Sequence, residues 1–302
     1  MQAFEDSFAY CHARVGPTLK VAVAVDGSKV GNKALDLAIA LANAARNPDD
    51  ATLDLLHVKT DPHAPIFLSP GHIEKECELR LSRPNVRVKA RFHVLGKPDG
   101  QSVTQVLAKA AEATQVDLLV VGATGLKIEK GDVHADSFTV MGSTSDGSLH
   151  RSDVSVAIVK ATSYELNGES GGMTFLVATD DSPSAKLAFA LCVSKLATAK
   201  DTIHVYVNKE NDGSVLEHPD TVLKHYKQVC DLKRLTCVMH SQRDHTTSVA
   251  DEILALARKL ECDILMLGTN GHARTNVIGS VSLRCARKAK CTTIVVKYPR
   301  IS

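Results

Sequence analysis

The feature that most constrains this chain is a glycine and serine pattern that occurs twice. Gly268-Thr269-Asn270-Gly271 is followed, after seven residues, by Gly279-Ser280-Val281-Ser282, and Gly122-Ala123-Thr124-Gly125 is followed, after sixteen, by Gly142-Ser143-Thr144-Ser145. A repeat on this scale indicates two copies of one folding unit. The 302 residues have room for two domains of roughly 150 residues each. We therefore expect domains at residues 17–161 and 172–298.

Composition narrows the class of protein. The chain is 44% apolar, has no Trp and only 4% aromatic residues, so its cores must consist of Val, Leu, Ile and Ala, as in buried parallel sheets. A net charge of +2 without basic clusters disfavours nucleic acid as a partner. No apolar stretch is long enough to span a membrane, and the first residues lack a hydrophobic leader. We expect a cytoplasmic protein.

The eight cysteines include no CxxC pair, which disfavours a zinc site. Several, such as Cys192 and Cys262, lie in apolar segments. This favours buried, reduced thiols, which fit a reducing cytosol. The alternative is a redox role for Cys285 and Cys291, which flank the segment before the last strand.

Strands and helices are expected to alternate in both copies. In the first copy we expect strands at Leu19–Val25, Leu53–Val58, Val86–Leu95, Val116–Val121 and Val156–Lys160, and helices at Ala34–Ala45, Ile73–Leu81 and Ser102–Ala113. In the second we expect strands at Met173–Ala178, Thr202–Val207, Leu235–His240, Cys262–Leu267 and Thr293–Lys297, and helices at Ser184–Ala197, Leu216–Leu232 and Val249–Leu260. The pattern predicts α/β domains with doubly wound parallel sheets, Rossmann-like in architecture.

Such sheets bind ligands beyond the carboxyl ends of the strands. A Gly-x-x-Gly turn lets main-chain N–H groups face outward, and a Gly-Ser-x-Ser segment that opens a helix favours an anion. Together the two segments predict a cradle for a di- or triphosphate. The alternative is that these residues only form turns and helix caps. Their repetition favours the phosphate interpretation.

Other residues at the same edge suggest further contacts. Asp26 and Asp180 follow the first strands and suit a ribose hydroxyl or Mg²⁺, or else they cap the next helix. Their side chains can join the glycine loops only if strands one and four are neighbours. Val58 and Val207 end the second strands, where main-chain atoms can meet an adenine edge. Core packing explains their side chains equally well. His57 and His204 we interpret as structural, hydrogen-bonded histidines.

These residues resemble the universal stress protein family. The resemblance rests on Val25-Asp26-Gly27-Ser28, on its counterpart Thr179-Asp180-Asp181-Ser182, and on the ending Gly279–Lys297. It covers nearly the whole chain as a tandem repeat. It implies two parallel five-stranded sheets with strand order 3-2-1-4-5 that form an intramolecular pseudo-dimer, in which Val156–Lys160 and Thr293–Lys297 pair. A homodimer of the whole chain stays open.

The resemblance also implies binding of ATP or AMP, with Mg²⁺ as an accompanying ion. Carried over by position, the binding residues of the second copy are Asp180, Val207, Leu267, Gly268, Gly271, Gly279, Ser280, Val281 and Ser282. Those of the first copy are Asp26, Val58, Val121, Gly122, Gly125, Gly142, Ser143, Thr144 and Ser145. The family spacer has nine residues, and neither copy keeps that length. Asp181 also replaces Gly27 and adds negative charge near the expected phosphates. We favour the second copy as the binding half.

Three functions compete. The first is an adenine-nucleotide-binding sensor in a stress response or signalling pathway. The second is a scaffold that recruits protein partners without nucleotide. The third is a slow ATP hydrolase, which is the weakest because Gly27-Ser28-Lys29-Val30-Gly31 lacks the spacing of a P-loop. No nucleophile and base can be paired from spacing alone, so no catalytic residue is assigned.

Overall fold

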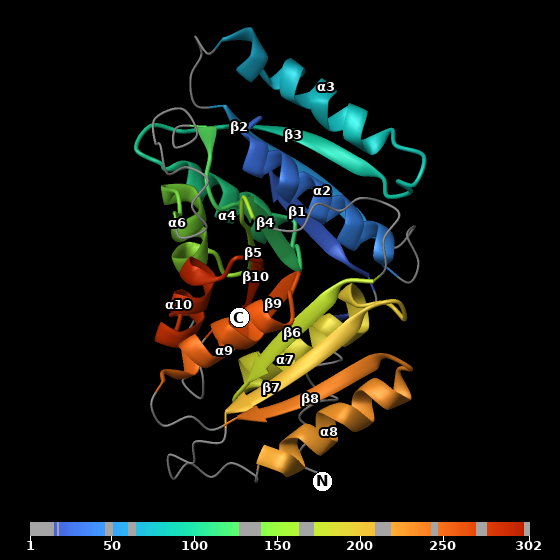
Figure 1. Ribbon diagram of the computed structural model, residues 1–302. Coiled ribbons are helices and arrows are strands. Elements are labelled where there is room, and N and C mark those ends of the chain that lie inside the picture. Colours follow the sequence, from blue (N-terminus) through green and yellow to red (C-terminus); the bar gives the residue numbers. More distant parts are fainter. Residues whose placement is uncertain are drawn as a thin grey trace. The chain divides into compact units, whose positions relative to one another are not determined.

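The computed structural model describes residues 15–16, 18–45, 51–59, 65–126, 140–162, 172–208, 219–242, 247–269 and 277–298. These residues divide into two compact units (Figure 1). We use the name N-terminal domain for the unit that contains strands β1 to β5, and C-terminal domain for the unit that contains β6 to β10.

Both domains alternate strands and helices. The N-terminal domain contains β1 (Lys20–Ala24), α2 (Lys29–Ala44), β2 (Thr52–Lys59), the 3-10 turn η2 (Ile66–Leu68), α3 (Pro70–Leu81), β3 (Ala90–Gly96), α4 (Val103–Ala113), β4 (Leu118–Gly122), α6 (Ser143–Arg151) and β5 (Ser155–Val159). The C-terminal domain contains β6 (Thr174–Thr179), α7 (Pro183–Leu191) with a π-helical extension η3 (Cys192–Leu196), β7 (Thr202–Asn208), α8 (Pro219–Leu232), β8 (Thr236–Gln242), α9 (Val249–Lys259), β9 (Ile264–Gly268), α10 (Ser280–Lys288) and β10 (Thr292–Val296).

Each domain has a five-stranded parallel sheet. The order is β3-β2-β1-β4-β5 in the N-terminal domain and β8-β7-β6-β9-β10 in the C-terminal domain. Both equal the predicted order 3-2-1-4-5, so the doubly wound α/β fold is confirmed. The pairing of the two terminal strands with each other stays a prediction.

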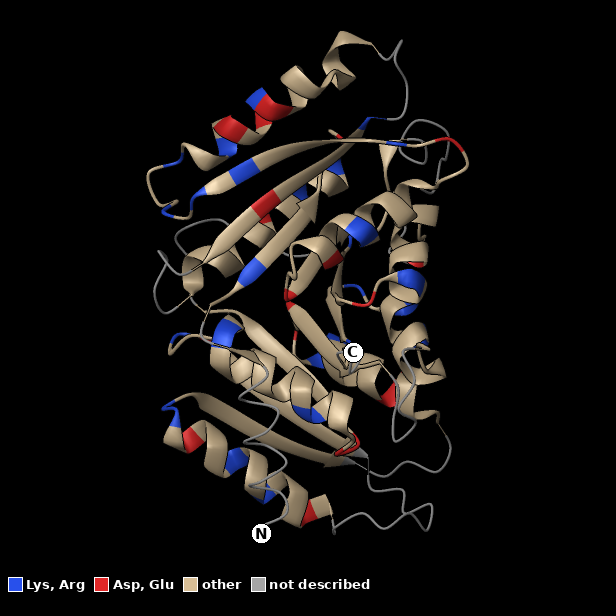
Figure 2. Cartoon of the chain, turned by 180° about the vertical axis from the view of Figure 1, so that it is seen from behind, with Lys and Arg blue, Asp and Glu red and all other residues tan. Residues whose placement is uncertain are grey.

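Helices cover both faces of each sheet, which explains why the central strands are apolar throughout. In β9, Leu265 and Leu267 pack in one cluster with Leu254 of α9, and the alternate positions turn to the α7 side. In the N-terminal domain α2 packs on β1 and β4, and α4 packs beside α6. Figure 2 shows the charged residues mainly on helices and loops, and β4, β5, β9 and β10 carry none.

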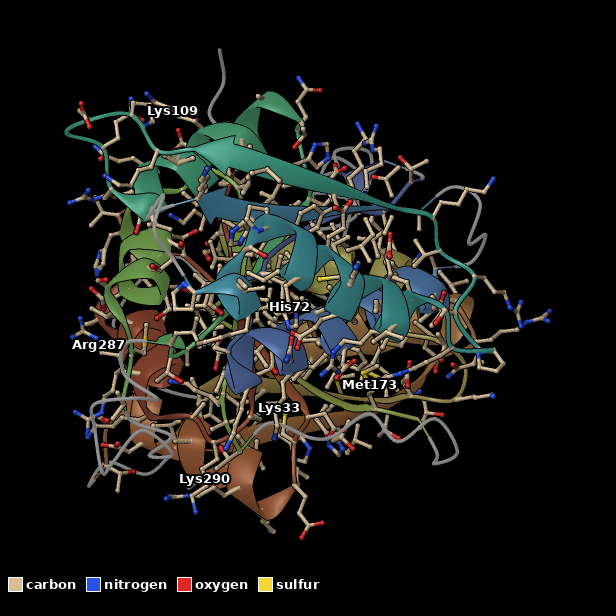
Figure 3. The ribbon with its side chains drawn as sticks, turned by 90° about the horizontal axis from the view of Figure 1, so that it is seen from above. Lys33, His72, Lys109, Met173, Arg287 and Lys290 are labelled. Carbon is tan, nitrogen blue, oxygen red and sulfur yellow. The ribbon has the colours of Figure 1, made fainter. Side chains whose placement is uncertain are left out.

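Serine residues set where most helices begin. Helices α2, α3, α4, α7 and α9 start after Ser28, Ser69, Ser102, Ser182 and Ser248, and each serine hydroxyl accepts a main-chain N–H of the first turn. The predicted starts of α2 and α3 were therefore too late. In α3, Pro70 occupies the first helical position, where its missing N–H costs nothing. Near the start of α2, the ammonium group of Lys33 (labelled in Figure 3) donates to the carbonyl oxygen of Ala161, 2.6 Å away.

The third strand begins later than its alternating sequence predicted. Val86–Lys89 lie outside β3, which starts at Ala90. The Asn43 side chain near the end of α2 accepts the N–H groups of Arg87 and Val88 at 2.8 and 3.0 Å. These N–H groups are therefore occupied by the Asn43 side chain, and sheet pairing with β2 starts only with Ala90 opposite Leu53.

The seven described cysteines are free thiols, and all except Cys237 are buried. Burial raises the pKa of the Cys77 and Cys285 thiols to about 12. Both thiols are thus protonated at neutral pH and poor nucleophiles. Cys11 lies outside the described residues. Within the described part of the chain, no helix combines the length and the apolar run that a membrane span requires.

A repeated carboxylate ties strand four to strand one. Asp117 accepts the N–H of Lys20 at 2.7 Å and donates its own N–H to the Lys20 carbonyl at 2.8 Å. Asp263 makes the same pair of bonds to Thr174, at 2.7 and 3.0 Å. Burial raises the pKa of the Asp263 carboxyl, and the bond from Thr174 opposes that rise. The carboxylates fix the register in which β1 meets β4 and β6 meets β9.

We predict that Asp263→Ala lowers the free energy of unfolding by about 2 kcal/mol, because the Thr174 N–H loses a charged acceptor. Asp263→Asn should cost clearly less, because the amide oxygen still accepts that N–H and the partly buried charge is removed. Urea unfolding followed by circular dichroism measures both variants. Equal losses in the two variants would show that the bond to Thr174 does not matter.

Candidate functional site

The candidate site lies at the carboxyl edge of each sheet, where strands one and four are neighbours. Val23 pairs with Val120 in the N-terminal domain, and Ala178 pairs with Leu267 in the C-terminal domain. Asp26 and Gly122 therefore leave the first sheet at one edge, as predicted. Asp180 and Gly268 do the same in the second sheet. Val121 and Leu267 are buried in the strands that end there, and Gly271 lies outside the described residues.

The first glycine of each pair allows strand four to touch the helix after strand one. A Cβ on Gly268 would lie 2.4 Å from Ser184 Oγ and 2.7 Å from the main-chain nitrogen of Ala185, in α7. A Cβ on Gly122 would lie 3.1 Å from the nitrogen of Gly31, in α2. Packing within the protein thus requires glycine at position 268, and at position 122 a side chain would force α2 to shift by a few tenths of an ångström. The two glycines bring the loop that follows strand four close to the Asp residue that follows strand one.

Helices α6 and α10 begin differently from the serine-capped helices. Their caps are Gly142 and Gly279, and neither helix receives a side-chain cap within the described residues. The first intrahelical bonds are donated by Asp146 to Gly142 and by Leu283 to Gly279. The N–H groups of the three residues between, Ser143–Ser145 and Ser280–Ser282, are thus left to face the carboxyl edge. Such an N-terminus suits a phosphate.

Two of the four serine hydroxyls in these turns point back into the protein. Ser145 Oγ donates to the carbonyl of Ala123 at 2.8 Å, and Ser282 Oγ donates to that of Gly268 at 2.7 Å. Gly142 and Gly279 add main-chain bonds of 2.7 Å to Ala123 and Thr269. The two hydroxyls therefore hold the helix start against the end of strand four. An anion there would meet main-chain N–H groups, while Ser143 and Ser280 keep their hydroxyls outside this network.

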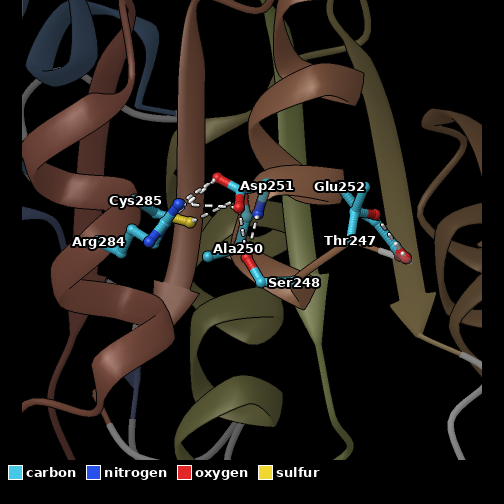
Figure 4. A network of polar contacts seen from close by, with 7 residues as sticks. All are labelled: Thr247, Ser248, Ala250, Asp251, Glu252, Arg284 and Cys285. Carbon is cyan, nitrogen blue, oxygen red and sulfur yellow. Dashed lines mark hydrogen bonds and ion pairs between the residues drawn. The ribbon is translucent and has the colours of Figure 1, made fainter. Parts of the chain in front are cut away.

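Helix α10 is also fixed at its side. The Arg284 guanidinium makes bonds of 2.8 Å to both carboxylate oxygens of Asp251 in α9 (Figure 4). The Ser248 hydroxyl and then Arg284 hold the pKa of Asp251 below its usual range. Both partners are well exposed, so this pair orients α10 more than it stabilises the fold.

In the N-terminal domain the carboxylate of Asp26 is hydrogen-bonded within the protein. Asp26 Oδ1 accepts the N–H and the hydroxyl of Ser28, at 3.0 and 2.5 Å, and Oδ2 accepts the N–H of Leu126 at 3.4 Å. A Cβ on Gly31 or on Gly125 would lie 2.7 Å from a carboxylate oxygen, so either substitution would force the Asp26 side chain to move. Asp26 thus caps a turn and also holds the loop after strand four.

The C-terminal domain leaves its aspartate open. Asp180 is exposed, and its carboxylate accepts the N–H of Ser182 at 3.1 Å, with no further partner among the described residues. Ala185 stands where the first domain has Gly31, so a methyl group occupies the space that Asp26 uses there. The two domains therefore differ in the very group that was predicted to meet a ribose.

The extra charge of Asp181 is neutralised inside the protein. Asp181 has φ +61°, matching the left-handed Gly27 at +78°. Its carboxylate pairs with Lys186 of α7 at 3.0 Å and accepts the hydroxyl of Tyr226 at 3.3 Å. Burial, and then Asp181, raises the pKa of Tyr226 well above its usual value. The sequence showed the charge at Asp181, but it did not show the compensating Lys186 and Tyr226.

The pairing register shows that Val58 and Val207 do not occupy equivalent positions in the second strands of the two domains. Lys20 pairs with Thr52 and Thr174 pairs with Thr202, so Val207 is the structural counterpart of His57, one residue before Val58. Both valines are buried. His57 Nδ1 lies 3.0 Å from the carbonyl of Val25, which fits a structural histidine. The adenine contacts expected at Val58 and Val207 therefore do not transfer from one domain to the other.

The match with known proteins agrees with this geometry. A family model described as the Universal stress protein family matches residues 18–160 and, a second time, residues 173–297. The chain belongs to the universal stress protein family. None of the curated proteins compared with it gives a match.

Two solved structures that cover both copies support the tandem fold of this universal stress protein. A chain from Pseudomonas aeruginosa UCBPP-PA14, assigned to the universal stress proteins, is 14% identical, with 95% of each chain covered and a TM-score of 0.59. A functionally unknown protein from Pseudomonas aeruginosa PAO1 is 13% identical, with 95% of this chain and 94% of that chain covered and a TM-score of 0.58. A universal stress protein in complex with cAMP is 24% identical over 48% of this chain and 99% of its own, with a TM-score of 0.35.

We predict that Gly268→Ala lowers the free energy of unfolding by about 1–3 kcal/mol, since the new methyl group meets main-chain atoms that cannot rotate away. Gly71→Ala is the matched control, because nothing lies within 4 Å of its Cβ position and Ala suits its helix. Its stability should be unchanged or higher. Unfolding in urea measures both variants, and a neutral Gly268→Ala would contradict the close approach of β9 to α7.

Proposed function

We propose that this universal stress protein binds an adenine nucleotide, ATP or AMP, in its C-terminal domain and acts as a sensor in a stress response or signalling pathway. The observation that carries the proposal is the start of α10, which has no side-chain cap among the described residues, at the sheet edge where the exposed Asp180 follows β6. Main-chain N–H groups of Ser280, Val281 and Ser282 supply donors and a helix dipole for phosphate oxygens. Asp180 supplies an acceptor for ribose hydroxyls.

The asymmetry of the two aspartates supports the choice of domain. Asp26 already accepts three donors, so a ribose would compete with Ser28 and Leu126 for it. Among the described residues Asp180 accepts one donor, the N–H of Ser182, and it is exposed. The charge of Asp181, the main objection to phosphate in the C-terminal domain, is paired with Lys186. The seven-residue loop between Gly271 and Gly279 contains His272 and Arg274, whose positions lie outside the described residues.

Binding of Mg²⁺ together with the nucleotide is a separate proposal. Asp180 is the residue that would hold the ion. The described residues contain no group of three or more His, Cys, Asp or Glu side chains arranged around a metal, so phosphate oxygens and water would supply most ligands. The cytoplasmic location also stays a prediction.

We predict that Gly279→Ser weakens ATP and AMP binding by about tenfold. The new hydroxyl would accept a main-chain N–H of the first turn of α10 and so compete with the phosphate for that donor. The loss of one charge-assisted hydrogen bond has about this effect on affinity. The helix itself should be as stable or slightly more stable, which separates lost binding from misfolding. Calorimetry on nucleotide-stripped protein measures affinity. Gly142→Ser is the matched control and should leave it unchanged. The bulkier pair Gly279→Val and Gly142→Val should give the same ranking.

We also predict that Asp180→Ala weakens nucleotide binding by about tenfold, as loss of a charged acceptor of the ribose implies. Asp26→Ala should leave the affinity unchanged and destabilise the N-terminal domain, where the carboxylate holds Ser28 and Leu126. Calorimetry and thermal melting distinguish the two effects. If Asp26→Ala alone removed binding, the nucleotide would have been assigned to the wrong domain.

The same experiments distinguish the competing functions. Absorbance at 260 nm of freshly purified protein detects copurified nucleotide. Saturable binding without release of ADP or phosphate supports the sensor, and slow release of ADP from bound ATP supports the hydrolase. A stripped protein that binds neither ATP, AMP nor cAMP would overturn the proposal and leave the scaffold that recruits protein partners.

A further inference from the structure

A second polar cluster lies away from the carboxyl edge, on β7 and β8 of the C-terminal domain. His204 Nδ1 is 2.8 Å from His240 Nε2, and the two rings stack with centroids 5.0 Å apart. His204 pairs with Leu176, which packs in the α9 cluster, so the imidazoles lie on the α9 face of the sheet. Both are partly buried, and neither ring has another hydrogen-bond partner in the described part of the chain.

The N-terminal domain has a different cluster at the equivalent positions. Asp54 pairs with Ala22 as His204 pairs with Leu176, and across the next strand Arg91 stands opposite Asp54 as Val238 stands opposite His204. His93 is then the counterpart of His240, and its Nε2 lies 2.9 Å from Asp54 Oδ1. The pairing geometry is thus repeated with different groups.

In the N-terminal domain the pair is completed by a cation from the protein itself. The Arg91 guanidinium donates to both oxygens of the buried Asp54, at 3.0 and 3.3 Å. In the C-terminal domain Val238 takes that position, is 41% exposed and carries no charge. The ring nitrogens of His204 and His240 therefore face each other, whereas the N-terminal domain has the Asp54 carboxylate between the His93 ring and the Arg91 guanidinium.

We propose that His204 and His240 form a binding site for a divalent transition-metal ion such as Zn²⁺, Co²⁺ or Ni²⁺, which takes the role that the Arg91 guanidinium has in the N-terminal domain. Imidazole nitrogen is a preferred ligand of these ions. Ring nitrogens bound at about 2.0–2.1 Å in tetrahedral geometry lie about 3.3 Å apart. Small side-chain rotations would open the 2.8 Å contact to that spacing.

The protonation state of both rings suits metal binding. Burial, and then the neighbouring His240, lowers the pKa of His204, and burial, and then the Lys259 ammonium, lowers the pKa of His240. Neutral imidazoles keep a lone pair for a metal at pH 7. Lys259 opposes a cation.

The site supplies two protein ligands, and water completes the coordination sphere, since no third His, Cys, Asp or Glu of the described residues joins the pair. The affinity therefore depends on both rings binding at once. Removing one ring should lower the affinity about a hundredfold, the order of magnitude gained when two linked contacts act together.

The test is Co²⁺ binding to the EDTA-treated full-length chain at pH 7.5, followed by calorimetry and absorption. Wild type should bind one equivalent at the pair, with d–d bands and without the thiolate charge-transfer band that cysteine ligation would give. His240→Gln and His204→Gln should weaken this binding about a hundredfold. His93→Gln, the matched change in the N-terminal domain, should leave it unchanged.

Two further variants keep both rings and change only their surroundings. Val238→Arg restores the internal cation at an exposed position, so it should block Co²⁺ without unfolding the sheet. Lys259→Ala should tighten binding. The proposal is overturned if wild type binds no Co²⁺, if Val238→Arg binds as wild type does, or if the histidine variants keep full affinity, which would assign the ion to other groups among the thirteen histidines and eight cysteines.

Discussion

The fold and the candidate site both depend on the close pairing of strand one with strand four. Asp117 and Asp263 lock this pairing at its start through reciprocal bonds to Lys20 and Thr174. Gly122 and Gly268 complete it at its end by letting the strand touch the next helix. Because these two contacts are repeated, each domain brings an aspartate, a glycine loop and a helix start to one edge. A ligand that needs all three could bind only there.

The duplicated architecture does not produce duplicated chemistry. One difference between the two edges is a methyl group: Gly31 leaves room for Asp26 Oδ1, whereas Ala185 stands at the equivalent position near the exposed Asp180. A similar divergence occurs on the second and third strands, where Asp54 bonds to both Arg91 and His93, whereas His204 and His240 face each other with Val238 in the position of Arg91. In both places the N-terminal domain satisfies its polar groups internally. In the C-terminal domain the described residues leave Asp180 and the two imidazoles with fewer partners, and these are the groups to which we propose to assign ligands.

Much of the fold was predictable from local patterns. The apolar runs before Gly122 and Gly268 identify buried strands, since only a sheet covered on both faces needs unbroken hydrophobic sequence. The order of the strands followed from the family resemblance. Boundaries were less predictable where a distant side chain decides them, as Asn43 does for the start of β3. The register of Val58 and Val207 was misjudged by sequence alignment because adjacent apolar residues in a buried strand look alike.

The sequence predicted that the glycine and serine segments share one edge of each sheet, but not what each residue does there. In the structure Gly122 and Gly268 pack against the next helix, and the hydroxyls of Ser145 and Ser282 bond to main-chain carbonyls. The main-chain N–H groups at the helix start have no side-chain cap among the described residues, and we propose that they meet the ligand. The sequence could not reveal them, because whether a main-chain donor is capped depends on contacts with other parts of the fold.

The most direct measurement is the amide ¹H–¹⁵N spectrum of the labelled protein during titration with AMP and ATP. The account predicts saturable shifts of the Ser280, Val281 and Ser282 amides, larger with either nucleotide than with adenosine, while the Ser143, Thr144 and Ser145 amides stay in place. Unchanged amides at the start of α10 under saturating nucleotide, or equal shifts with adenosine, would contradict it.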